Sequence, residues 1–343
     1  MRALELEAFG RMAVADLPEP TPGPGEVVLE IIATGICGSD IHGFTGENGR
    51  RIVGQIMGHE SVGRVHTIGE GVEVSQAPIG AVATFNPVIV SAESRLVFAG
   101  REQHDPDRIV IGVATDRISA FAHRIVIPAE NVVLLPDSMP LSYGALIEPL
   151  AVGLNAVRRV HVAAGETVLV VGGGPIGQST TLAALHEGAS RVYVSEPNAD
   201  RRALCTSLGA IALDPREAPI AEQIVARQGS PVDVAIDAVG ISESLADALV
   251  STSFGGRVCL VGMGKPELSL QAYRVSTEER SIVGSFCYSF RVFNDAAEWV
   301  GGGDEIFGRL ISAEVSLEEA PSAFERLATK ADMPGKILVR LDR

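Results

Sequence analysis

The segment TVLVVGGGPIGQSTTLAALHEGA, residues 167–189, decides the fold of this chain. It begins with a short apolar run typical of a buried strand, and a glycine-rich turn then leads into a stretch with helical spacing of apolar residues. The same alternation of strand and helix continues through VDVAIDAVG and GRVCLVGMG to about residue 285. Uniformly apolar short strands separated by amphipathic helices predict a parallel sheet covered on both faces.

The glycine-rich turn has the spacing G-x-G-x-x-G at Gly172, Gly174 and Gly177. In this pattern the first glycine allows a tight turn, the second lets backbone N–H groups approach a pyrophosphate, and the third lets the helix pack close to the strand. The helix N-terminus then stabilises the phosphate charge. Glu196 closes the next strand, where an acidic side chain accepts hydrogen bonds from the adenosine ribose. The turn, the helix and the acid together predict a dinucleotide site.

The dinucleotide is predicted to be NAD, because the carboxylate of Glu196 repels the 2′-phosphate of NADP. Arg201 and Arg202 follow closely and oppose this preference, since cations attract that phosphate. The alternative interpretation is a glycine-rich turn in an unrelated α/β domain. The candidate cofactor-binding residues are Gly172, Gly174, Pro175, Ile176, Gly177, Glu196, Arg201 and Val261.

The length and composition indicate a globular chain of two domains. With 343 residues the chain is too long for one ordinary core, and it is 46% hydrophobic and 21% charged. Residues 1–150 contain β-branched and alternating runs broken by Gly and Pro, which predict a strand-rich domain. Residues 151–285 form the domain with the parallel sheet. Residues 286–343 lose its alternation and are expected to complete the first domain.

The net charge and the absence of long apolar runs indicate which partners and which location to expect. The net charge of −15, from 28 basic and 43 acidic residues, disfavours nucleic acid as a partner because it repels phosphates. The pair Arg50 and Arg51 is expected on the solvated surface. No apolar run is long enough for a membrane span and no signal peptide is recognisable, so a cytoplasmic location is expected. No close cysteine pair suggests a disulfide, and Cys205 and Cys259 are predicted to be core residues.

A second site is suggested by the segment GICGSDIHG, residues 35–43. Cys37 follows a strand and precedes a short helix that Ser39 or Asp40 can cap, and a thiol near a helix N-terminus ionises more easily. Farther along, His59 and Glu60 lie between a glycine turn and a strand. Taken singly, a cysteine is more often a small buried hydrophobe, and a histidine beside a glutamate is more often structural.

The joint arrangement of these segments changes that balance. The segments GICGSDIHG, MGHESVGRV, LIEPLAVG, VVGGGPIG and VSEPNADRR occur in the order and at the intervals of one family. Over nearly its whole length the chain resembles the zinc-dependent medium-chain dehydrogenase/reductase family, and more closely the sorbitol dehydrogenase-like branch. The resemblance implies an α/β fold with a strand-rich GroES-like catalytic domain and a Rossmann domain built on a doubly wound parallel sheet.

The resemblance also implies a catalytic zinc ion held by Cys37 and His59, with Glu148 at the third ligand position. Glu60 matches a nearby carboxylate of the family that either lies behind the ligands or exchanges into the ligand set. Thiolate, imidazole and carboxylate suit zinc, and three protein ligands leave a fourth position open to water or substrate. Whether Glu60 or Glu148 binds zinc at rest stays open.

In the family, the residue at Ser39 contacts the substrate oxygen and the residue at His42 carries the proton to solvent. The implied reaction is NAD-dependent oxidation of a secondary alcohol (a polyol, sugar or cyclic alcohol) to a ketone. The alternatives are a zinc-free reductase on the same fold, which the ligand set disfavours, and a non-catalytic NAD-binding sensor, which the proton relay disfavours. A homodimer or homotetramer is expected.

Two parts of the chain depart from the family pattern. The four cysteine positions of the family's structural zinc lobe are occupied by Ser91, Ser94, Val97 and Asp105, so one catalytic zinc and no structural zinc is expected. Packing of Leu96, Val97 and Phe98, either within the chain or at a subunit contact, is expected to hold that loop instead. In the substrate pocket, Gly43 and Cys287 stand where polyol-oxidising relatives have an aromatic residue and an arginine, which disfavours sorbitol itself. Further candidate pocket residues are Phe85, Tyr288 and Arg291.

Overall fold

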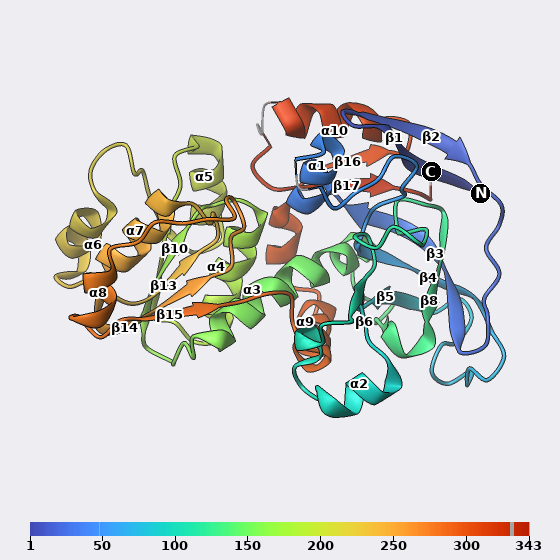
Figure 1. Cartoon of the computed structure of the whole chain (residues 1–343), viewed down its shortest axis with the longest axis horizontal. Coiled ribbons are helices and arrows are strands. Elements are labelled where there is room, and N and C mark those ends of the chain that lie inside the picture. Colours follow the sequence, from blue (N-terminus) through green and yellow to red (C-terminus); the bar gives the residue numbers. More distant parts are fainter. Residues whose placement is uncertain (48, 330–332, 343) are drawn as a thin grey trace. The chain divides into compact units, whose positions relative to one another are not determined.

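A parallel sheet contains the glycine-rich segment, and its strands run in the order β12-β11-β10-β13-β14-β15 (Figure 1). The strands are β10 (Thr167–Val171), β11 (Arg191–Ser195), β12 (Ile211–Leu213), β13 (Val232–Asp237), β14 (Thr252–Leu260) and β15 (Ser281–Gly284). All neighbouring strands are parallel, and Leu169 lies opposite Tyr193 on one side and Ala235 on the other. From β10 the sheet grows through β11 and β12 on one side, and from β13 it grows through β14 and β15 on the other. The point between β10 and β13, where this order changes direction, is the switch point at which open α/β sheets bind ligands.

Helices connect these strands and cover the sheet. They are α4 (Pro175–His186), α5 (Ala199–Ser207), α6 (Ile220–Gln228), α7 (Ser242–Ser251) and α8 (Ala272–Ser276). Helix α4 packs against β10 and β11, whereas α7 packs against β10 and β13. Val168, Leu169 and Val170 are fully buried, because a strand covered on both faces has no solvent side. The predicted Rossmann fold is confirmed.

The computed structural model describes residues 1–47, 49–329 and 333–342, which divide into two compact units. The parallel-sheet unit is Pro149–Tyr288, and the antiparallel-sheet unit combines Met1–Glu148 with Ser289–Arg343. Helix α3 (Ile147–Arg159) spans the division between them. No helix within the described ranges has the length and apolar character needed to cross a bilayer.

The antiparallel-sheet unit is built on strands in the order β16-β17-β3-β4-β5-β9, with β8 also paired to β3. These strands are β3 (Glu26–Gly35), β4 (Glu60–Ile68), β5 (Val82–Phe85), β8 (Arg124–Pro128), β9 (Val132–Leu134), β16 (Ile311–Ser316) and β17 (Lys336–Arg340). Two separate pairs are β1 (Arg2–Ala8) with β2 (Arg11–Asp16), and β6 (Val88–Ile89) with β7 (Ile109–Val110). The expected strand-rich GroES-like architecture is confirmed.

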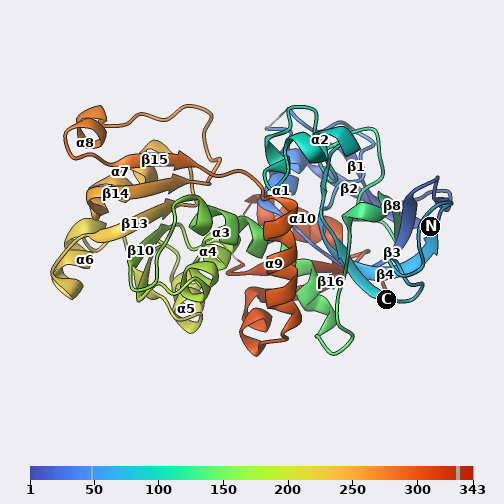
Figure 2. The same cartoon turned by 90° about the horizontal axis from the view of Figure 1, so that it is seen from below.

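The last strand of the chain belongs to this sheet. β17 pairs antiparallel with β3, so that Leu338 lies opposite Gly35. Figure 1 and Figure 2 both show the late strand β16 in the same unit as the early strands β3 and β4, and β17 lies between β16 and β3 in the sheet. The pairing matters for the site below, because it brings the start of β17 to the end of β3.

Helices and aromatic side chains close the antiparallel-sheet unit. The helices are α1 (Gly38–Thr45), α2 (Ala92–Val97), α9 (Phe290–Gly301) and α10 (Ala320–Thr329), and the 3₁₀ turns are η1 (Glu102–His104), η2 (Ala129–Asn131), η3 (Leu141–Leu146) and η4 (Glu305–Leu310). The Phe324 ring packs 5.7 Å from the Phe44 ring and 5.5 Å from the Phe121 ring, measured between centroids. These contacts join α1 and α10 over a core formed by Leu4, Leu29 and their neighbours.

Apolar packing within this chain does not hold the loop at residues 91–105, and packing of the loop at a subunit contact stays a prediction. Leu96 is 82% exposed and Val97 is 59% exposed, and Phe98 is only half-buried. The side chains at this turn of α2 point away from the core. Ser91, at one of the cysteine positions of the family, instead caps α2 by accepting a hydrogen bond from the Ser94 N–H at 3.0 Å.

Polar contacts with α9 and η2 hold this loop instead. The Arg95 guanidinium lies 2.7 Å from a Glu130 carboxylate oxygen and 4.5 Å from the centroid of the Phe290 ring. The buried carboxylate of Glu102 accepts hydrogen bonds from the backbone N–H groups of Gly100 at 2.8 Å and Phe290 at 3.1 Å. Glu102 therefore ties the loop to the N-terminus of α9, where a negative charge is favourable.

Two of the cysteines are core residues, as predicted. Cys205 on α5 and Cys259 on β14 are both 0% exposed. Burial raises the pKa of each thiol to about 12, so both stay protonated and inert at neutral pH.

Candidate functional site

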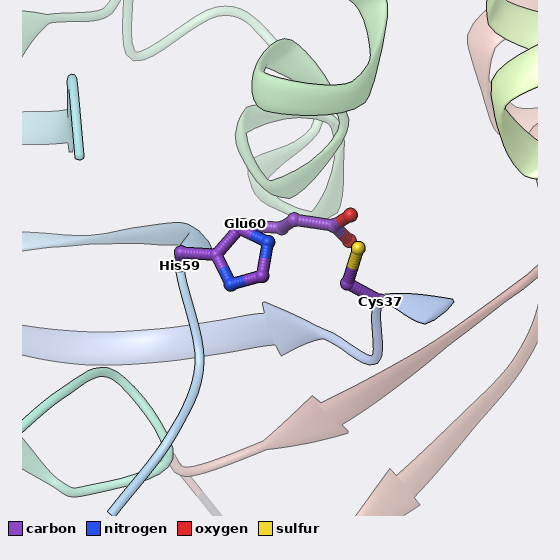
Figure 3. Close-up of side chains that lie close together, drawn as sticks. All are labelled: Cys37, His59 and Glu60. Atoms are coloured by element: carbon purple, nitrogen blue, oxygen red, sulfur yellow. The ribbon is translucent and has the colours of Figure 1, made fainter. Parts of the chain in front are cut away.

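The end of β3 and the start of β4 bring Cys37, His59 and Glu60 together. Cys37 follows β3 directly, Glu60 opens β4, and Gly35 lies opposite Glu60 in the antiparallel pair. A sulfur, a ring nitrogen and a carboxylate oxygen from these three residues lie within 4.8 Å of one another. Figure 3 shows the three side chains pointing toward one another. The strand register therefore builds a cluster of metal-binding groups that residue spacing alone does not reveal.

The buried Glu60 carboxylate faces two different environments. Its Oε1 accepts a hydrogen bond from Lys336 Nζ at 2.5 Å, whereas its Oε2 has no protein partner among the described residues. A Cβ at Gly35 would lie 2.3 Å from that Oε2, so glycine is needed there to leave room for the carboxylate. Lys336 opens β17, and a lone lysine in a strand carries no motif from which the sequence could have predicted this role.

Asp40 lies beside His59. Asp40 Oδ1 lies 3.7 Å from His59 Nδ1, and Asp40 Oδ2 accepts a hydrogen bond from the Cys37 N–H at 3.1 Å. Burial lowers the pKa of His59, but the charges of Asp40 and Cys37 outweigh it and raise that pKa to about 10. Because Nδ1 faces Asp40, Nε2 is the ring nitrogen available to a metal, an arrangement that orients many metal-binding histidines.

The cluster fits a divalent metal ion such as zinc. A thiolate, an imidazole nitrogen and a carboxylate oxygen are donors that zinc prefers. The unpartnered Glu60 Oε2 would gain a cationic partner, and the metal would replace the proton that the surrounding charges otherwise favour on His59. The donor set and its charge, and not the residue types alone, support the predicted zinc site.

Glu148, predicted as the third ligand, lies near this cluster but outside it. It stands in the first turn of α3 and is 7% exposed. Its charge acts on both His59 and Lys336, yet its carboxylate is not among the atoms gathered within 4.8 Å. Of the two candidate carboxylates, Glu60 is therefore the immediate neighbour of Cys37 and His59 in this structure.

Ser39 and His42 stand on one face of α1, since residues three apart on a helix are neighbours. Ser39 is half-buried, whereas the His42 side chain is 53% exposed and its Nδ1 lies 3.3 Å from Glu47 Oε2. The two side chains thus lead from the interior of the unit to solvent, as a proton path requires.

The candidate pocket residues occupy different surroundings. Phe85 belongs to the core of the antiparallel-sheet unit, and Tyr288 is 1% exposed. Arg291 is exposed on α9. Cys287 is half-buried and has φ of 46°, a backbone conformation that residues other than glycine rarely adopt.

The glycine-rich turn has the backbone that its spacing predicts. Gly172 has φ of 96°, and a Cβ at Gly177 would lie 1.8 Å from the Gly172 carbonyl oxygen. A Cβ at Gly174, in contrast, would meet nothing within 4 Å. Pro175 then opens α4 and Ile176 follows it, both half-buried. Gly177 is therefore required by packing, while Gly174 is open on the side from which a ligand would approach.

This difference predicts unequal losses of stability for two alanine substitutions. Gly177→Ala should lower the stability by about 1–3 kcal/mol, because the turn must shift to relieve the clash. Gly174→Ala should leave the stability within about 0.5 kcal/mol and still weaken dinucleotide binding, because the methyl group occupies open space at the turn. Thermal unfolding and NADH titration of both variants measure the two effects. Equal losses of stability would contradict the assignment.

Glu196 is anchored to the glycine-rich turn. It is 4% exposed, its Oε2 accepts a hydrogen bond from the Gly173 N–H at 2.8 Å, and its Oε1 accepts one from the Asn198 N–H at 2.8 Å. Two backbone donors hold the carboxylate at the end of β11, beside the turn after β10. Val261 lies at the same edge of the sheet, after β14, and its N–H bonds the Asp237 carbonyl. The predicted cofactor residues thus gather at the carboxyl ends of the strands.

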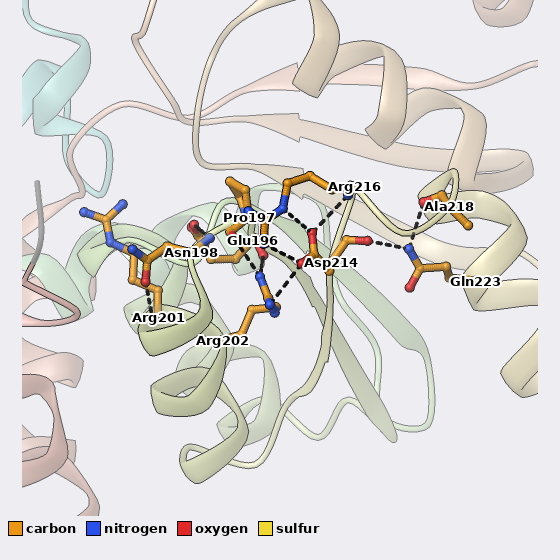
Figure 4. Close-up of polar contacts among 9 residues, drawn as sticks. All are labelled: Glu196, Pro197, Asn198, Arg201, Arg202, Asp214, Arg216, Ala218 and Gln223. Carbon is orange, nitrogen blue, oxygen red and sulfur yellow. Dashed lines mark hydrogen bonds and ion pairs between the residues drawn. The ribbon is translucent and has the colours of Figure 1, made fainter.

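The two arginines after Glu196 differ in their contacts (Figure 4). Arg202 donates to the carbonyl oxygens of Glu196 and Pro197 at 2.9 and 2.7 Å, and it lies 3.0 Å from Asp214 Oδ2. Asp214 also forms a bidentate pair with Arg216. In Figure 4 the Arg201 guanidinium points away from this cluster. Arg202 is therefore committed to contacts within the unit.

Arg51 departs from its expected place. Instead of lying on the solvated surface it is only 4% exposed, and its guanidinium nitrogens Nε and Nη2 are buried without hydrogen-bond partners among the described residues. The charge of Asp40 and that of Cys37 act on it. Sequence reasoning missed this residue because an arginine beside another arginine in a loop usually is a surface pair.

Comparison with known proteins agrees with this geometry. Residues 23–137 match the alcohol dehydrogenase GroES-like domain, and residues 175–301 match the zinc-binding dehydrogenase domain. The chain is 31% identical to sorbitol dehydrogenase of Ovis aries, covering 99% of this chain and 96% of that protein. It is 34% identical to L-idonate 5-dehydrogenase of Vitis vinifera, covering 78% of this chain and 75% of that protein.

A solved structure shares the whole architecture. The zinc-binding dehydrogenase of Sinorhizobium meliloti, determined with NADP bound, has a TM-score of 0.90 and 31% identity, covering 99% of this chain and 98% of that chain. The family models and the full-length relatives confirm the resemblance seen in the sequence. The chain belongs to the zinc-type medium-chain dehydrogenase/reductase family of oxidoreductases, in its sorbitol dehydrogenase-like branch.

Proposed function

We propose that this chain is an NAD-dependent dehydrogenase that interconverts a secondary alcohol, of the polyol, sugar or cyclic type, and its ketone at one zinc ion. The observation that carries the proposal is the buried cluster of Cys37, His59 and Glu60 at the paired ends of β3 and β4. When bound there, zinc acts as a Lewis acid that polarises the substrate oxygen. The dehydrogenase relatives support a small-molecule alcohol as substrate.

The protein's own residues supply the ligands and the proton path. Cys37 and His59 would bind the metal, with Glu60 or Glu148 as the carboxylate, and the Asp40 carboxylate lies 3.7 Å from His59 Nδ1. Ser39 accepts the hydroxyl proton of the substrate, and His42 passes it to solvent. A bound nicotinamide cofactor would accept the hydride of the carbinol carbon, and the glycine-rich turn would hold the pyrophosphate of that cofactor.

The proton path makes a prediction for His42→Ala. Turnover should fall by about 10- to 100-fold because the exposed end of the path is lost, and small buffer bases should restore part of it. Bound zinc should stay unchanged, since His42 lies outside the ligand cluster. Steady-state kinetics at increasing imidazole concentration, with metal analysis of the same samples, measures both quantities. His104→Ala, another exposed histidine in the same unit, serves as the control. Loss of zinc from His42→Ala would refute this division of roles.

The preference for NAD is proposed from Glu196. Its carboxylate is held by two backbone N–H groups beside the glycine-rich turn, so its negative charge cannot swing away from a 2′-phosphate. Arg202 is engaged by carbonyl groups and Asp214, which leaves it poorly placed to offset that charge. We expect kcat/KM for NAD to exceed that for NADP by at least about 10-fold.

One experiment tests the proposed function. Secondary alcohols of the polyol, sugar and cyclic classes are screened with NAD and NADP, and the zinc content of the purified protein is measured. Turnover that depends on zinc supports the proposal. Full activity without zinc would favour a zinc-free reductase, and no turnover across the panel would favour an NAD-binding sensor.

A further inference from the structure

Arg51 is a buried cation beside the metal cluster. Its side chain lies along α1, where its Cγ and Nε are 2.5 and 3.2 Å from the position that a Cβ on Gly43 would take, and the Met57 sulfur is 3.1 Å from the same point. Glycine is the residue type that leaves room at position 43 for the Arg51 side chain. The glycine at position 43, which the sequence presented as a missing aromatic residue, therefore makes space for the arginine.

The unpartnered nitrogens of Arg51 are a matched pair. Nε and Nη2 lie on the same edge of the planar guanidinium, and their N–H bonds point in parallel. Both are buried and neither has a hydrogen-bond partner among the described residues. Two parallel donors of this kind match the two oxygens of a carboxylate or a phosphate. This edge is preformed for an anion with two oxygens.

The described residues do not supply that anion. No ion pair within 4.0 Å involves Arg51 in the described parts of the chain, although the charges of Asp40 and Cys37 act on it at longer range. Asp40 is already engaged, because one oxygen accepts the Cys37 N–H and the other faces His59. Burying a guanidinium without close partners costs free energy, and a ligand that accepts hydrogen bonds from Nε and Nη2 would offset that cost.

We propose that Arg51 determines substrate specificity by binding an anionic group, a carboxylate or a phosphate, on a polyol substrate. The inference rests on the proposed function, which it narrows from alcohols in general to polyols with one acidic end. The guanidinium holds that end by two parallel hydrogen bonds, while the secondary hydroxyl lies at the cluster of Cys37 and His59. Arg51 takes no part in the chemical step.

The test compares matched substrates that differ only in the acidic group. The probes are D-glucitol, D-gluconate and D-glucitol 6-phosphate, together with the corresponding neutral, carboxylate and phosphate forms of the pentitol series. For the wild-type protein loaded with zinc and NAD, we expect kcat/KM for the preferred anionic form to exceed that for its neutral partner by at least about 30-fold. The carboxylate and phosphate forms show which anion the site accepts.

Two variants of Arg51 distinguish the effect of its paired N–H donors from the effect of its positive charge. Arg51→Met should remove most of the preference for the anionic form and change kcat/KM for the neutral form by less than about threefold. Arg51→Lys keeps a positive charge but offers no paired donors, so it should retain only a small part of the preference; it also keeps the test available if Arg51→Met folds poorly. Arg50→Met, which changes the exposed neighbour, is the matched control and should keep the preference.

Calorimetric binding of the same probes distinguishes the failure of this inference from failure of the proposed function. If an anionic probe binds in a way that depends on Arg51 and no alcohol is turned over, the anion site is supported and the proposed dehydrogenase function is refuted. If neutral polyols are turned over with no preference for anionic forms, and Arg51→Met leaves this turnover unchanged, the dehydrogenase function is supported and the anion site is refuted.

Discussion

We expect the Cys37→Ser protein to lose its zinc and its dehydrogenase activity together. A serine hydroxyl is a far poorer zinc ligand than a thiolate, and the cluster offers only His59 and a carboxylate in its place. We expect bound metal to fall from about one ion per chain to near zero after dialysis. The value of kcat/KM should fall by roughly 10³-fold or more, because the electrophile that polarises the substrate oxygen is absent.

A matched substitution controls for the loss of a thiol. Cys287→Ser makes the same sulfur-to-oxygen change at another half-buried cysteine, outside the ligand cluster. It should keep its zinc, as metal analysis by mass spectrometry measures. If the Cys37→Ser protein retained both zinc and activity, Cys37 would not be a zinc ligand. If it lost zinc but kept full activity, zinc would not take part in the reaction.

We expect the Lys336→Met protein to be destabilised by about 3–5 kcal/mol, because the substitution leaves the Glu60 carboxylate buried without its cation. Lys336 is 4% exposed and Glu60 is fully buried. Burial lowers the pKa of Lys336, but the charges of Glu60, Cys37 and Glu148 outweigh it and raise that pKa above its ordinary value. Lys336 is therefore ionised at neutral pH. Denaturant unfolding of the zinc-free protein measures the loss, so that metal binding does not mask it.

Two further variants identify the cause. Lys336→Met combined with Glu60→Gln should recover most of the lost stability, since no unpaired charge remains buried. Lys265→Met removes an exposed lysine in the parallel-sheet unit and should change the stability by less than about 0.5 kcal/mol. If the double variant were as unstable as Lys336→Met alone, the lysine would act through packing and not through Glu60.

Local patterns account for the parts of the fold that the sequence predicts well. The strands and helices between residues 167 and 260 follow from the spacing of apolar residues, which neighbouring positions set. Gly172 and Gly177 are predictable for the same reason, because the tight turn and the close contact of helix and strand involve residues only a few positions apart. Cys37 and His59 could be named as a pair only through the resemblance to a family.

Other parts of the chain were misread because local patterns do not report long-range contacts. Leu96 and Val97 were expected to pack, yet within this chain they are exposed, and Arg95 and Glu102 hold the loop through contacts with distant elements. Arg51 looked like a surface residue, yet the path that Gly43 leaves along α1 buries it. Neither contact has a period or a motif that a single sequence displays.

The sequence by itself therefore determined the Rossmann unit, its glycine-rich turn and the residue types of a zinc site. The tertiary structure alone decided which carboxylate lies beside Cys37 and His59, that Lys336 holds Glu60 across 276 positions, and that Arg51 presents an unpaired guanidinium edge. The physical reason is that turn and helix conformations depend on adjacent residues. The pairing of β3 with β4 and β17, in contrast, sets the surroundings of each site residue from segments far apart in the chain.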